Sequence, residues 1–428
     1  MSDKFDAIIV GAGVAGSVAG YLMAKEGLEV LIIERGNYAG SKNMTGGRLY
    51  SHSLEKIMPG FAKEAPVERK VTREKISMLT EESAITIDFY SDKLGEQGKN
   101  SYTVLRGEFD QWLAEKAEEA GAQLIPGVRV DDLILQDGKV CGVRAGEDEL
   151  EAEVVILADG VNSLLAQKLG FRGELKPYEV AVGVKEVIEL PQEVIEDRFN
   201  LKDGEGLAWL FVGSPSAGRI GGGFLYTNKA SISIGVVCSL QEIERSSKTV
   251  PQMLENFKNH PIIEPLIKGG TMVEYSGHLV PEGGYHMIPK LVGDGVLVIG
   301  DAAGFCINIG YTVRGMDLAI ASAEAAAKAV LEAKAKGDYS EASLAKYKTL
   351  IEDSFIMKDL NLYRKFPQFM ENPRIFNEYP RMISDIMTDM FIIDGSPSKP
   401  LKSKILRHVK TVGLMNVVKD GFKGVRSI

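Results

Sequence analysis

The chain has 428 residues, of which 45% are hydrophobic and 25% are charged. This composition is typical of a globular protein, and the length exceeds one compact core, so two or three lobes are expected. The net charge of −9 argues against a general nucleic-acid-binding protein. No apolar stretch reaches the roughly 18 residues that span a bilayer, so any membrane contact is expected to be peripheral.

The ends of the chain and its cysteines favour a cytoplasmic location. Residues 1–4 run directly into an apolar segment without a basic and apolar leader, so we expect no secretory signal peptide. Cys141, Cys238 and Cys306 lie far apart and form no C-x-x-C pair. A disulfide framework and a local metal site are therefore not expected.

The N-terminal segment predicts a dinucleotide-binding unit. An apolar run typical of a buried strand, residues 5–10, leads into a G-x-G-x-x-G motif made by Gly11, Gly13 and Gly16. In this motif the first glycine allows a tight turn, the second lets the backbone approach a pyrophosphate, and the third lets the helix pack against the strand. The N–H groups at the start of the following helix, expected over residues 15–25, would bind the phosphates.

A second apolar run, residues 30–33, ends on Glu34. This position lies about 20 residues after the glycines, where a carboxylate accepts hydrogen bonds from the adenosine ribose.

The next elements are expected to leave the nucleotide lobe and return to it. Strands are predicted between residues 76 and 89, and an amphipathic helix over residues 108–120. Residues 122–135 and 139–145 indicate a small hairpin region with Asp137-Gly138 as its turn.

The rest of the chain also alternates between the nucleotide lobe and a second lobe. An apolar run over residues 154–158 predicts a parallel strand that is buried on both faces. Alternating patterns from about residue 180 to 278 predict a second, largely antiparallel sheet. Residues 296–301 return to the nucleotide lobe, residues 316–336 form a long Ala-rich helix, and a helical tail follows.

Small or acidic residues follow three of these buried strands, at the glycine loop, at Asp159-Gly160 and at residues 300–304. Open α/β sheets bind ligands at the carboxyl ends of their strands. Further distinctive blocks occupy residues 42–50 (KNMTGGRLY), 104–110 (VLRGEFD), 281–289 (PEGGYHMIP) and 310–316 (GYTVRGM).

With these blocks the chain resembles flavoproteins of the glutathione-reductase-like superfamily. Over its whole length it is more similar to electron-transfer-flavoprotein:quinone oxidoreductases of the FixC type. The resemblance implies an α/β fold, in which a Rossmann-like FAD-binding domain with a parallel sheet is interleaved with a mainly antiparallel substrate or quinone domain. The expected boundaries are 1–75, 102–178 and 285–336 for the FAD domain, 76–101 and 179–284 for the second domain, and 337–428 for a helical C-terminal region.

The resemblance also implies one FAD and the residues that hold it. They are Gly11, Gly13, Ala15, Gly16, Glu34, Arg35, Gly47, Arg48, Arg106, Val130, Asp159, Gly160, Gly300, Asp301, Gly304, Thr312, Val313 and Arg314.

Several of these residues also have a plain structural interpretation. Asp301 either accepts a hydrogen bond from a ribityl or ribose hydroxyl or caps the following helix. Arg106 either pairs with the cofactor phosphates or with Asp110 one turn on. Residues 312–316 are expected to begin the Ala-rich helix, whose positive dipole end could face the flavin pyrimidine edge. Asp159 is expected mainly to turn the strand.

Three other residues near the expected flavin have open roles. Cys306 is either a small packed hydrophobe or a redox thiol, and packing is the commoner case. His278 and His286 flank the 281–289 block, where they are either ordinary histidines or members of a proton relay.

The expected partners follow from what the sequence lacks. No second well-placed G-x-G-x-x-G exists, so no dedicated NAD(P)H domain is expected and electrons should arrive from a protein. The resemblance implies electron-transfer flavoprotein subunits of the FixA/FixB type as donor and a quinone as acceptor. A [4Fe–4S] cluster needs four thiolates and the chain has three cysteines, which fits a separate ferredoxin-like partner of the FixX type.

Two other enzyme classes remain as alternatives: an isoprenoid reductase similar to geranylgeranyl reductases, and an NAD(P)H-dependent flavin monooxygenase. A non-catalytic scaffold is disfavoured because the cofactor motifs are intact. A flavin halogenase is disfavoured because no W-x-W-x-I-P motif is present.

The C-terminal tail has its own charge pattern. From residue 399 onward there are eight Lys or Arg and one acid, Asp420. Leu401, Ile405, Val409 and Val412 can share one helix face, which predicts a cationic amphipathic helix. Such a helix would dock on an anionic surface, either the cytoplasmic face of the inner membrane or an acidic partner. The alternative is a helix packed on the flavin lobe with solvated lysines.

Overall fold

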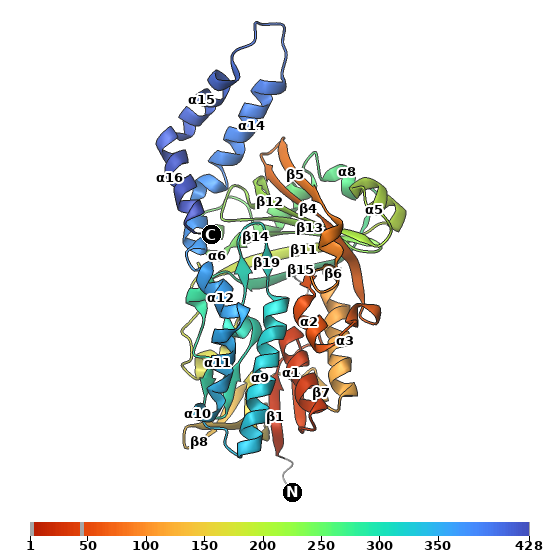
Figure 1. Cartoon of the computed structure of the whole chain (residues 1–428), viewed down its shortest axis with the longest axis vertical. Coiled ribbons are helices and arrows are strands. Elements are labelled where there is room, and N and C mark those ends of the chain that lie inside the picture. Colours follow the sequence, from red (N-terminus) through yellow and green to blue (C-terminus); the bar gives the residue numbers. More distant parts are fainter. Residues whose placement is uncertain (1–3, 43–46, 428) are drawn as a thin grey trace.

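The computed structural model describes residues 4–42 and 47–427. Two sheets lie one beyond the other along the long axis, and the C-terminal helices run up one side of the molecule (Figure 1). The resemblance block at residues 42–50 is only partly described, because residues 43–46 lie outside these ranges.

The N-terminal sheet is built on parallel strands. β1 (Phe5–Val10) lies between β10 (Asp148–Leu157) and β2 (Val30–Glu34), with Ile9 opposite Ile156 and Ile32. The apolar runs are buried on both faces, because helices pack on the sheet. The remaining strands are β7 (Gln123–Pro126), β8 (Asp132–Gln136), β9 (Lys139–Ala145), β16 (Val292–Gly293) and β17 (Val296–Val298).

The hairpin expected over residues 122–145 is correct only for β8 and β9, which are joined by a turn in which Asp137 and Gly138 have positive φ. Residues 123–126 instead form β7, a strand that pairs in parallel with β2. Four residues are too few to show a pattern, and tertiary pairing decides their partner.

Three long helices cover this sheet: α1 (Val14–Lys25), α3 (Arg106–Glu119) and α9 (Met316–Lys336). α1 packs between the other two. The Ala-rich helix does not begin at residue 312 as expected. Val313–Arg314 form the short strand β19, which pairs with β18 (Ile307–Asn308), and Gly315 is the N-cap of α9.

The second sheet has nine strands and is largely antiparallel. Its order is β15-β11-β14-β13-β12-β4-β6-β3, with β5 paired to β4, and the β12–β4 pair is parallel. The bounds are β3 Arg48–Tyr50, β4 Val67–Leu79, β5 Ala84–Tyr90, β6 Ser101–Val104, β11 Val180–Glu189, β12 Glu205–Gly213, β13 Gly221–Thr227, β14 Ser231–Ser239 and β15 Thr271–Pro281. β4 therefore starts before residue 76, where the strands were expected. The domain boundaries themselves stay a prediction.

Shorter helices lie around the two sheets. They are α2 (His52–Ile57), α4 (Leu164–Lys168), α5 (Gln192–Phe199), α6 (Leu240–Ile243), α7 (Val250–Lys258) and α8 (Glu264–Ile267). α7 carries a capping box between Thr249 and Gln252, and its Phe257 ring packs edge-on against Phe211 at 4.8 Å.

The C-terminal region is helical, as predicted. Its helices are α10 (Glu341–Leu344), α11 (Lys346–Asp353), α12 (Phe355–Leu362), α13 (Phe366–Met370), α14 (Glu378–Phe391), α15 (Leu401–Val412) and α16 (Leu414–Val425). The first three run beside α9, whereas α14 and α15 project beyond the second sheet (Figure 1). The α/β fold class is thus confirmed. Within the described residues, none of the helices has the length and hydropathy to cross a bilayer.

Candidate active site

One large cavity joins the two sheets. Its volume is about 1210 Å³, above the ~300–1,000 Å³ of ordinary ligand pockets. The glycine loop lines one part of it, and strands of the second sheet and the C-terminal region line the rest. The cavity therefore has room for a dinucleotide together with a second molecule.

The glycine loop is closed so tightly that side chains are excluded. Gly11 has φ +105°, and a Cβ there would lie 2.4 Å from the carbonyl oxygen of Ala158. A Cβ on Gly16 would lie 1.9 Å from the carbonyl oxygen of Gly11. Gly13 is the N-cap of α1 and lines the cavity without a side-chain cap, so the first N–H groups of the helix are available for an anion.

Glu34 holds the far side of this loop. Its buried carboxylate accepts hydrogen bonds from the backbone N–H of Ala12 at 2.8 Å and of Gly36 at 2.6 Å. Each carboxylate oxygen has a further lone-pair site that a ribose hydroxyl can use. Arg35 and Val130 line the cavity as well.

Asp159 follows β10 and presents an unsatisfied acceptor. It lines the cavity, and its Oδ1 has no hydrogen-bond partner among the described residues although it is buried. Burial raises the pKa of Asp159 to about 6. Buried acceptors are nearly always paired, so this oxygen indicates a donor that a ligand supplies. Gly160 beside it has φ +80° and forms the turn.

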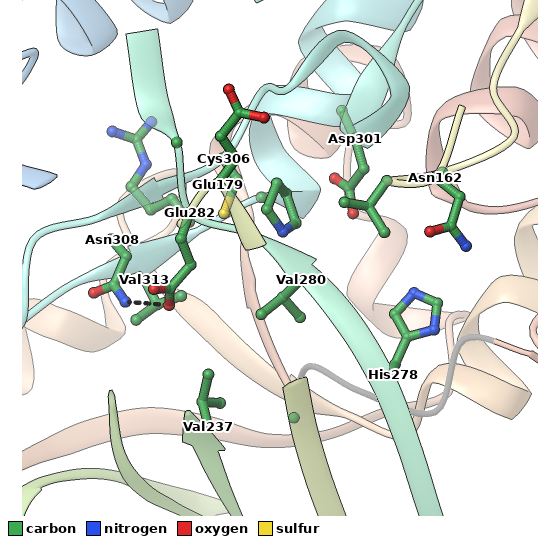
Figure 2. A pocket seen from close by; sticks show the side chains of 18 of the residues that line it. Asn162, Glu179, Val237, His278, Val280, Glu282, Asp301, Cys306, Asn308 and Val313 are labelled. Atoms are coloured by element: carbon green, nitrogen blue, oxygen red, sulfur yellow. Dashed lines mark hydrogen bonds between the residues drawn. The ribbon is translucent and has the colours of Figure 1, made fainter. Parts of the chain in front are cut away.

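Asp301 lies in the 3₁₀ turn Gly300–Ala303 and also lines the cavity (Figure 2). Burial raises the pKa of its carboxyl group. Because Gly315 is the N-cap of α9, Asp301 does not cap that helix. The structure thus removes the capping alternative and leaves the carboxylate on the cavity wall.

Two arginines on the wall are held by acidic partners. Arg106 forms a bidentate pair with Asp110, both N–O distances being 2.7 Å. Arg48 binds Glu74 and stacks on the Tyr50 ring at 4.5 Å. Of the two partners expected for Arg106, the structure shows Asp110. The guanidinium group also lines the cavity.

Fourteen of the predicted residues line the cavity, and four lie behind the wall or beside it. Gly16 contacts Gly11, and a Cβ on Gly300 would lie 2.8 Å from the Cβ of Ala15. Gly304 approaches Met287, and Thr312 accepts a hydrogen bond from the Ile309 N–H in the β18–β19 loop. Their role in cofactor binding stays a prediction, as it does for the other fourteen.

Arg314 lines the cavity but also joins two helices. It donates to Asp317 at 2.6 Å and to Asp359 at 2.7 Å, so it connects the start of α9 to α12. Val313, beside it, is exposed and faces the cavity.

The end of the cavity next to the second sheet carries titratable groups with shifted pKa values. Burial raises the pKa of Glu282 to about 7. Burial also raises the pKa of the Cys306 thiol well above its usual range, so Cys306 is not a thiolate at neutral pH. The pKa of His278 is lowered by burial and then by Arg106, so His278 is neutral.

The sequence did not predict the contribution of the C-terminal region to this cavity. Its wall includes Phe366, Pro367, Gln368, Phe369, Met370, Glu371, Ile375 and Phe376. The cluster of aromatic, Pro and Met residues at 366–370 was a usable signal, because such residues are uncommon on a solvated helix. Which lobe they cover is decided only by the fold.

The residues present fit FAD. They combine a cradle that admits only glycine, a buried carboxylate beside it, an orphaned acceptor at Asp159 and a cavity of dinucleotide size. Three family models match the chain: "FAD binding domain" over residues 4–199, "ETF-QO, ubiquinone-binding" over residues 180–280, and "ETF-QO/FixC family C-terminal domain" over residues 366–428.

Relatives match along the whole chain. The "Probable electron transfer flavoprotein-quinone oxidoreductase YdiS" of Escherichia coli (strain K12) is 62% identical over 426 residues, covering 100% of this chain and 99% of the relative. Protein FixC of Bradyrhizobium diazoefficiens is 40% identical, covering 100% and 99%. A geranylgeranyl bacteriochlorophyll reductase-like protein from Thermoplasma acidophilum shares the fold, with TM-score 0.72, 22% identity and coverage of 97% and 99%. The chain therefore belongs to the ETF-QO/FixC family of FAD-dependent oxidoreductases.

Proposed function

We propose that this protein accepts electrons from an electron-transfer flavoprotein of the FixA/FixB type and passes them to a quinone, in company with a ferredoxin-like protein of the FixX type. The observation that carries the proposal is the single cavity that runs from the glycine loop to strands β11–β15. Those strands coincide with residues 180–280, which the ubiquinone-binding model matches. A cofactor and an oxidant can therefore share one enclosed space.

FAD supplies the redox chemistry, since a flavin accepts two electrons and releases them together or singly. The chain binds and orients it: the N-terminus of α1 takes the phosphates, Glu34 the adenosine ribose, and Asp159 and Asp301 accept hydroxyl hydrogen bonds. Gly315 and Met316 line the cavity at the N-terminus of α9. With FAD bound, the positive dipole end of that helix would stabilise negative charge on a flavin ring placed beside it.

The proposed partners follow from groups that this chain does not supply. All three cysteines are free thiols, and Cys141 lies on β9, Cys238 on β14 and Cys306 in the loop before β18. Four thiolates on a second chain would complete an iron–sulfur relay. The glycines at 221–223 belong to β13, so they are not a second nucleotide loop.

Stopped-flow absorbance tests the electron donor. FAD-loaded protein is mixed with reduced electron-transfer flavoprotein or with NADPH, and loss of the oxidised flavin band is followed. We expect fast reduction by the flavoprotein and slow reduction by NADPH, and faster quinone reduction when the FixX-type protein is added. Stoichiometric bleaching by NADPH alone, with none by the flavoprotein, would contradict the proposal.

A second candidate function is reduction of isoprenoid double bonds. It is favoured by the fold shared along the whole chain with the geranylgeranyl reductase-like protein. Mass spectrometry of a geranylgeranyl substrate after incubation with reduced protein separates the two candidates. A mass gain of hydrogen in the substrate supports the reductase, and reduction of the quinone alone supports the transfer function.

The helix expected to dock through Leu401, Ile405, Val409 and Val412 is α15, and it packs against α14, where Arg407 and His408 bind Asp389. We further propose that the basic tail binds the cytoplasmic face of the inner membrane through α16 instead. Its apolar stripe, formed by Leu414, Val418, Phe422 and Val425, is exposed to solvent, with Phe422 65% exposed. Lys419, Lys423 and Arg426 follow the same helical spacing and are exposed beside the stripe. An apolar face flanked by cations is the pattern of a helix that lies in the plane of an anionic bilayer.

Vesicle flotation with anionic phosphatidylglycerol tests this location. We expect the protein to float and a Leu414→Ser/Phe422→Ser variant to stay in solution. The matched control is Ile87→Ser/Phe89→Ser on β5, which removes apolar side chains of similar exposure, 69% and 54%, from another face. Equal flotation of both variants and the parent would remove the membrane proposal.

A further inference from the structure

Glu282 is a carboxyl group that the assigned cofactor sites do not use. It directly follows β15 and lines the cavity where the second sheet meets the β18–β19 hairpin (Figure 2). Its backbone N–H donates to the carbonyl oxygen of Glu179 at 2.7 Å, so the main chain beneath the side chain is held in place.

Asn308 fixes the orientation of this carboxyl group. The Asn308 Oδ1 atom accepts the Gly310 N–H at 3.1 Å, which leaves the Nδ2 atom to donate to Glu282 Oε1 at 3.4 Å. Oε1 is thereby an acceptor, and Oε2 is the atom that can carry a proton toward the cavity. The two side chains point toward each other in Figure 2.

The surroundings of Glu282 favour the protonated form. Burial raises the pKa of Glu282 to about 7, although the Asn308 hydrogen bond acts in the opposite direction. Burial raises the pKa values of Cys306 and Cys238, with a smaller contribution from the charge of Glu282, so both thiols stay neutral. Other titratable groups on the cavity wall include Lys176, Tyr178, Glu179, His278, His286, Asp301, Tyr311, Arg314 and Glu371, together with Arg106 and Asp159.

The two histidines are less suited to deliver a proton. His278 is neutral because burial and Arg106 lower its pKa, so it has no acidic proton to give near pH 7. His286 is exposed, and its ring packs edge-on against Tyr285 at 5.6 Å. Glu282 is therefore a partly buried group at this end of the cavity that is able to change protonation state near neutral pH.

We propose that Glu282 is the proton donor to the quinone, an inference that rests on the proposed function. Reduction of a quinone to a quinol takes two electrons and two protons. The reduced flavin, an anion at neutral pH, would supply both electrons and the proton on its N5 atom, and Glu282 Oε2 gives the other proton to a quinone oxygen and becomes a carboxylate. Water then reprotonates Glu282 by way of the exposed Asn308 side of the cavity.

Single-turnover oxidation of photoreduced, FAD-loaded protein by a short-chain ubiquinone analogue tests this assignment between pH 6 and 9. The rate in the parent protein should fall as pH rises above about 7, because the carboxyl group loses its proton. Glu282→Gln should be slower by about 100-fold at pH 6.5, the loss typical of a missing general acid, with no break near pH 7. Oxidation by ferricenium, which takes an electron without a proton, should be equal in both proteins.

The control is Glu189→Gln, an identical change at an exposed position outside the cavity, which should match the parent in every assay. An equal rate and pH profile for Glu282→Gln and the parent would overturn the inference and leave the proposed function intact. Equal slowing with quinone and ferricenium would overturn it too, because the defect would not be proton transfer. Failure of the parent to reduce the quinone would overturn both proposals.

Discussion

Helices α1 and α16 are both twelve residues long and both combine glycines with large apolar side chains. In α1 nine residues are buried, because the helix lies on the parallel sheet between α3 and α9. In α16 the one buried residue is Asp420, and the apolar side chains face solvent. Apolar composition alone therefore does not say whether a helix belongs to the core or to a docking surface.

The glycines of the two helices show the physical difference. A Cβ on Gly20 of α1 would lie 2.5 Å from the Cδ1 atom of Ile32, so glycine is needed for close packing on the sheet. Gly421 of α16 has no heavy atom within 4 Å of such a Cβ. Gly20 of α1 allows the helix to approach the sheet closely, whereas Gly421 of α16 only adds freedom to the unfolded chain.

Blocking the start of α1 should have the largest effect. Gly13 has φ −74°, which valine adopts without strain, and it faces the cavity. Gly13→Val should therefore fold and yet lose FAD completely, because the side chain prevents the close approach of a pyrophosphate. The flavin-to-protein absorbance ratio of purified protein measures this, and a full yellow spectrum would contradict the assignment of the loop.

The buried carboxyl group beside that loop should make the FAD-free protein sensitive to pH. The folded pKa of Asp159 is about 6 and its ordinary value is 3.8, so the folded state is favoured while the carboxyl is protonated. As pH rises from 4 to 7 the contribution of Asp159 to the free energy of unfolding should fall by about 2.4 kcal/mol. Glu282 and Asp301 have raised pKa values too, so urea unfolding of the apoprotein should show a larger total fall, and Asp159→Asn should reduce that fall by the contribution of Asp159.

Substitution of Asp420, which holds α16 in place, should have a smaller effect on stability. Asp420 accepts hydrogen bonds from Arg374 at 2.7 and 3.0 Å and from Tyr379 at 2.6 Å. Asp420→Asn should cost about 1.5–3 kcal/mol and raise hydrogen exchange in residues 414–425, with FAD content unchanged. Unchanged exchange there would show that other contacts hold the helix.

Acid should loosen α16 as well. The Arg374 hydrogen bonds hold the pKa of Asp420 far below its usual value. This contact therefore stabilises α16 above about pH 4 and weakens as pH falls. Hydrogen exchange across residues 414–425 at pH 3 and pH 6 measures the change.

The smallest effect is expected at the exposed glycine of α16. Gly421→Ala should stabilise the helix by about 0.5–1 kcal/mol, because alanine has less freedom to lose and nothing obstructs its Cβ. Hydrogen exchange within α16 measures this change. The matched Gly20→Ala variant of α1 should lower the melting temperature. Equal responses at the two positions would remove the distinction drawn between the helices.

Much of the nucleotide lobe was predictable because its signals are local. The run 5–10, the three glycines and Glu34 lie within one βαβ unit, so sequence order is also spatial order. The Ala-rich helix over residues 316–336 was predicted with its observed bounds. The start at residue 312 was wrong because pairing of Val313 with Asn308 gives those residues to a hairpin instead.

The sequence by itself determined the fold class and the glycine loop of a dinucleotide site, because strand periodicity and glycine geometry depend on near neighbours. FAD was implied by the resemblance of the sequence blocks to FixC-type flavoproteins. Only the tertiary structure decided that Arg106 pairs with Asp110, that residues 366–376 close the cavity, and that Asn308 orients Glu282. The pKa of Glu282 belongs to this second group. It depends on burial by segments distant in the chain, and no local pattern encodes how much water such segments exclude.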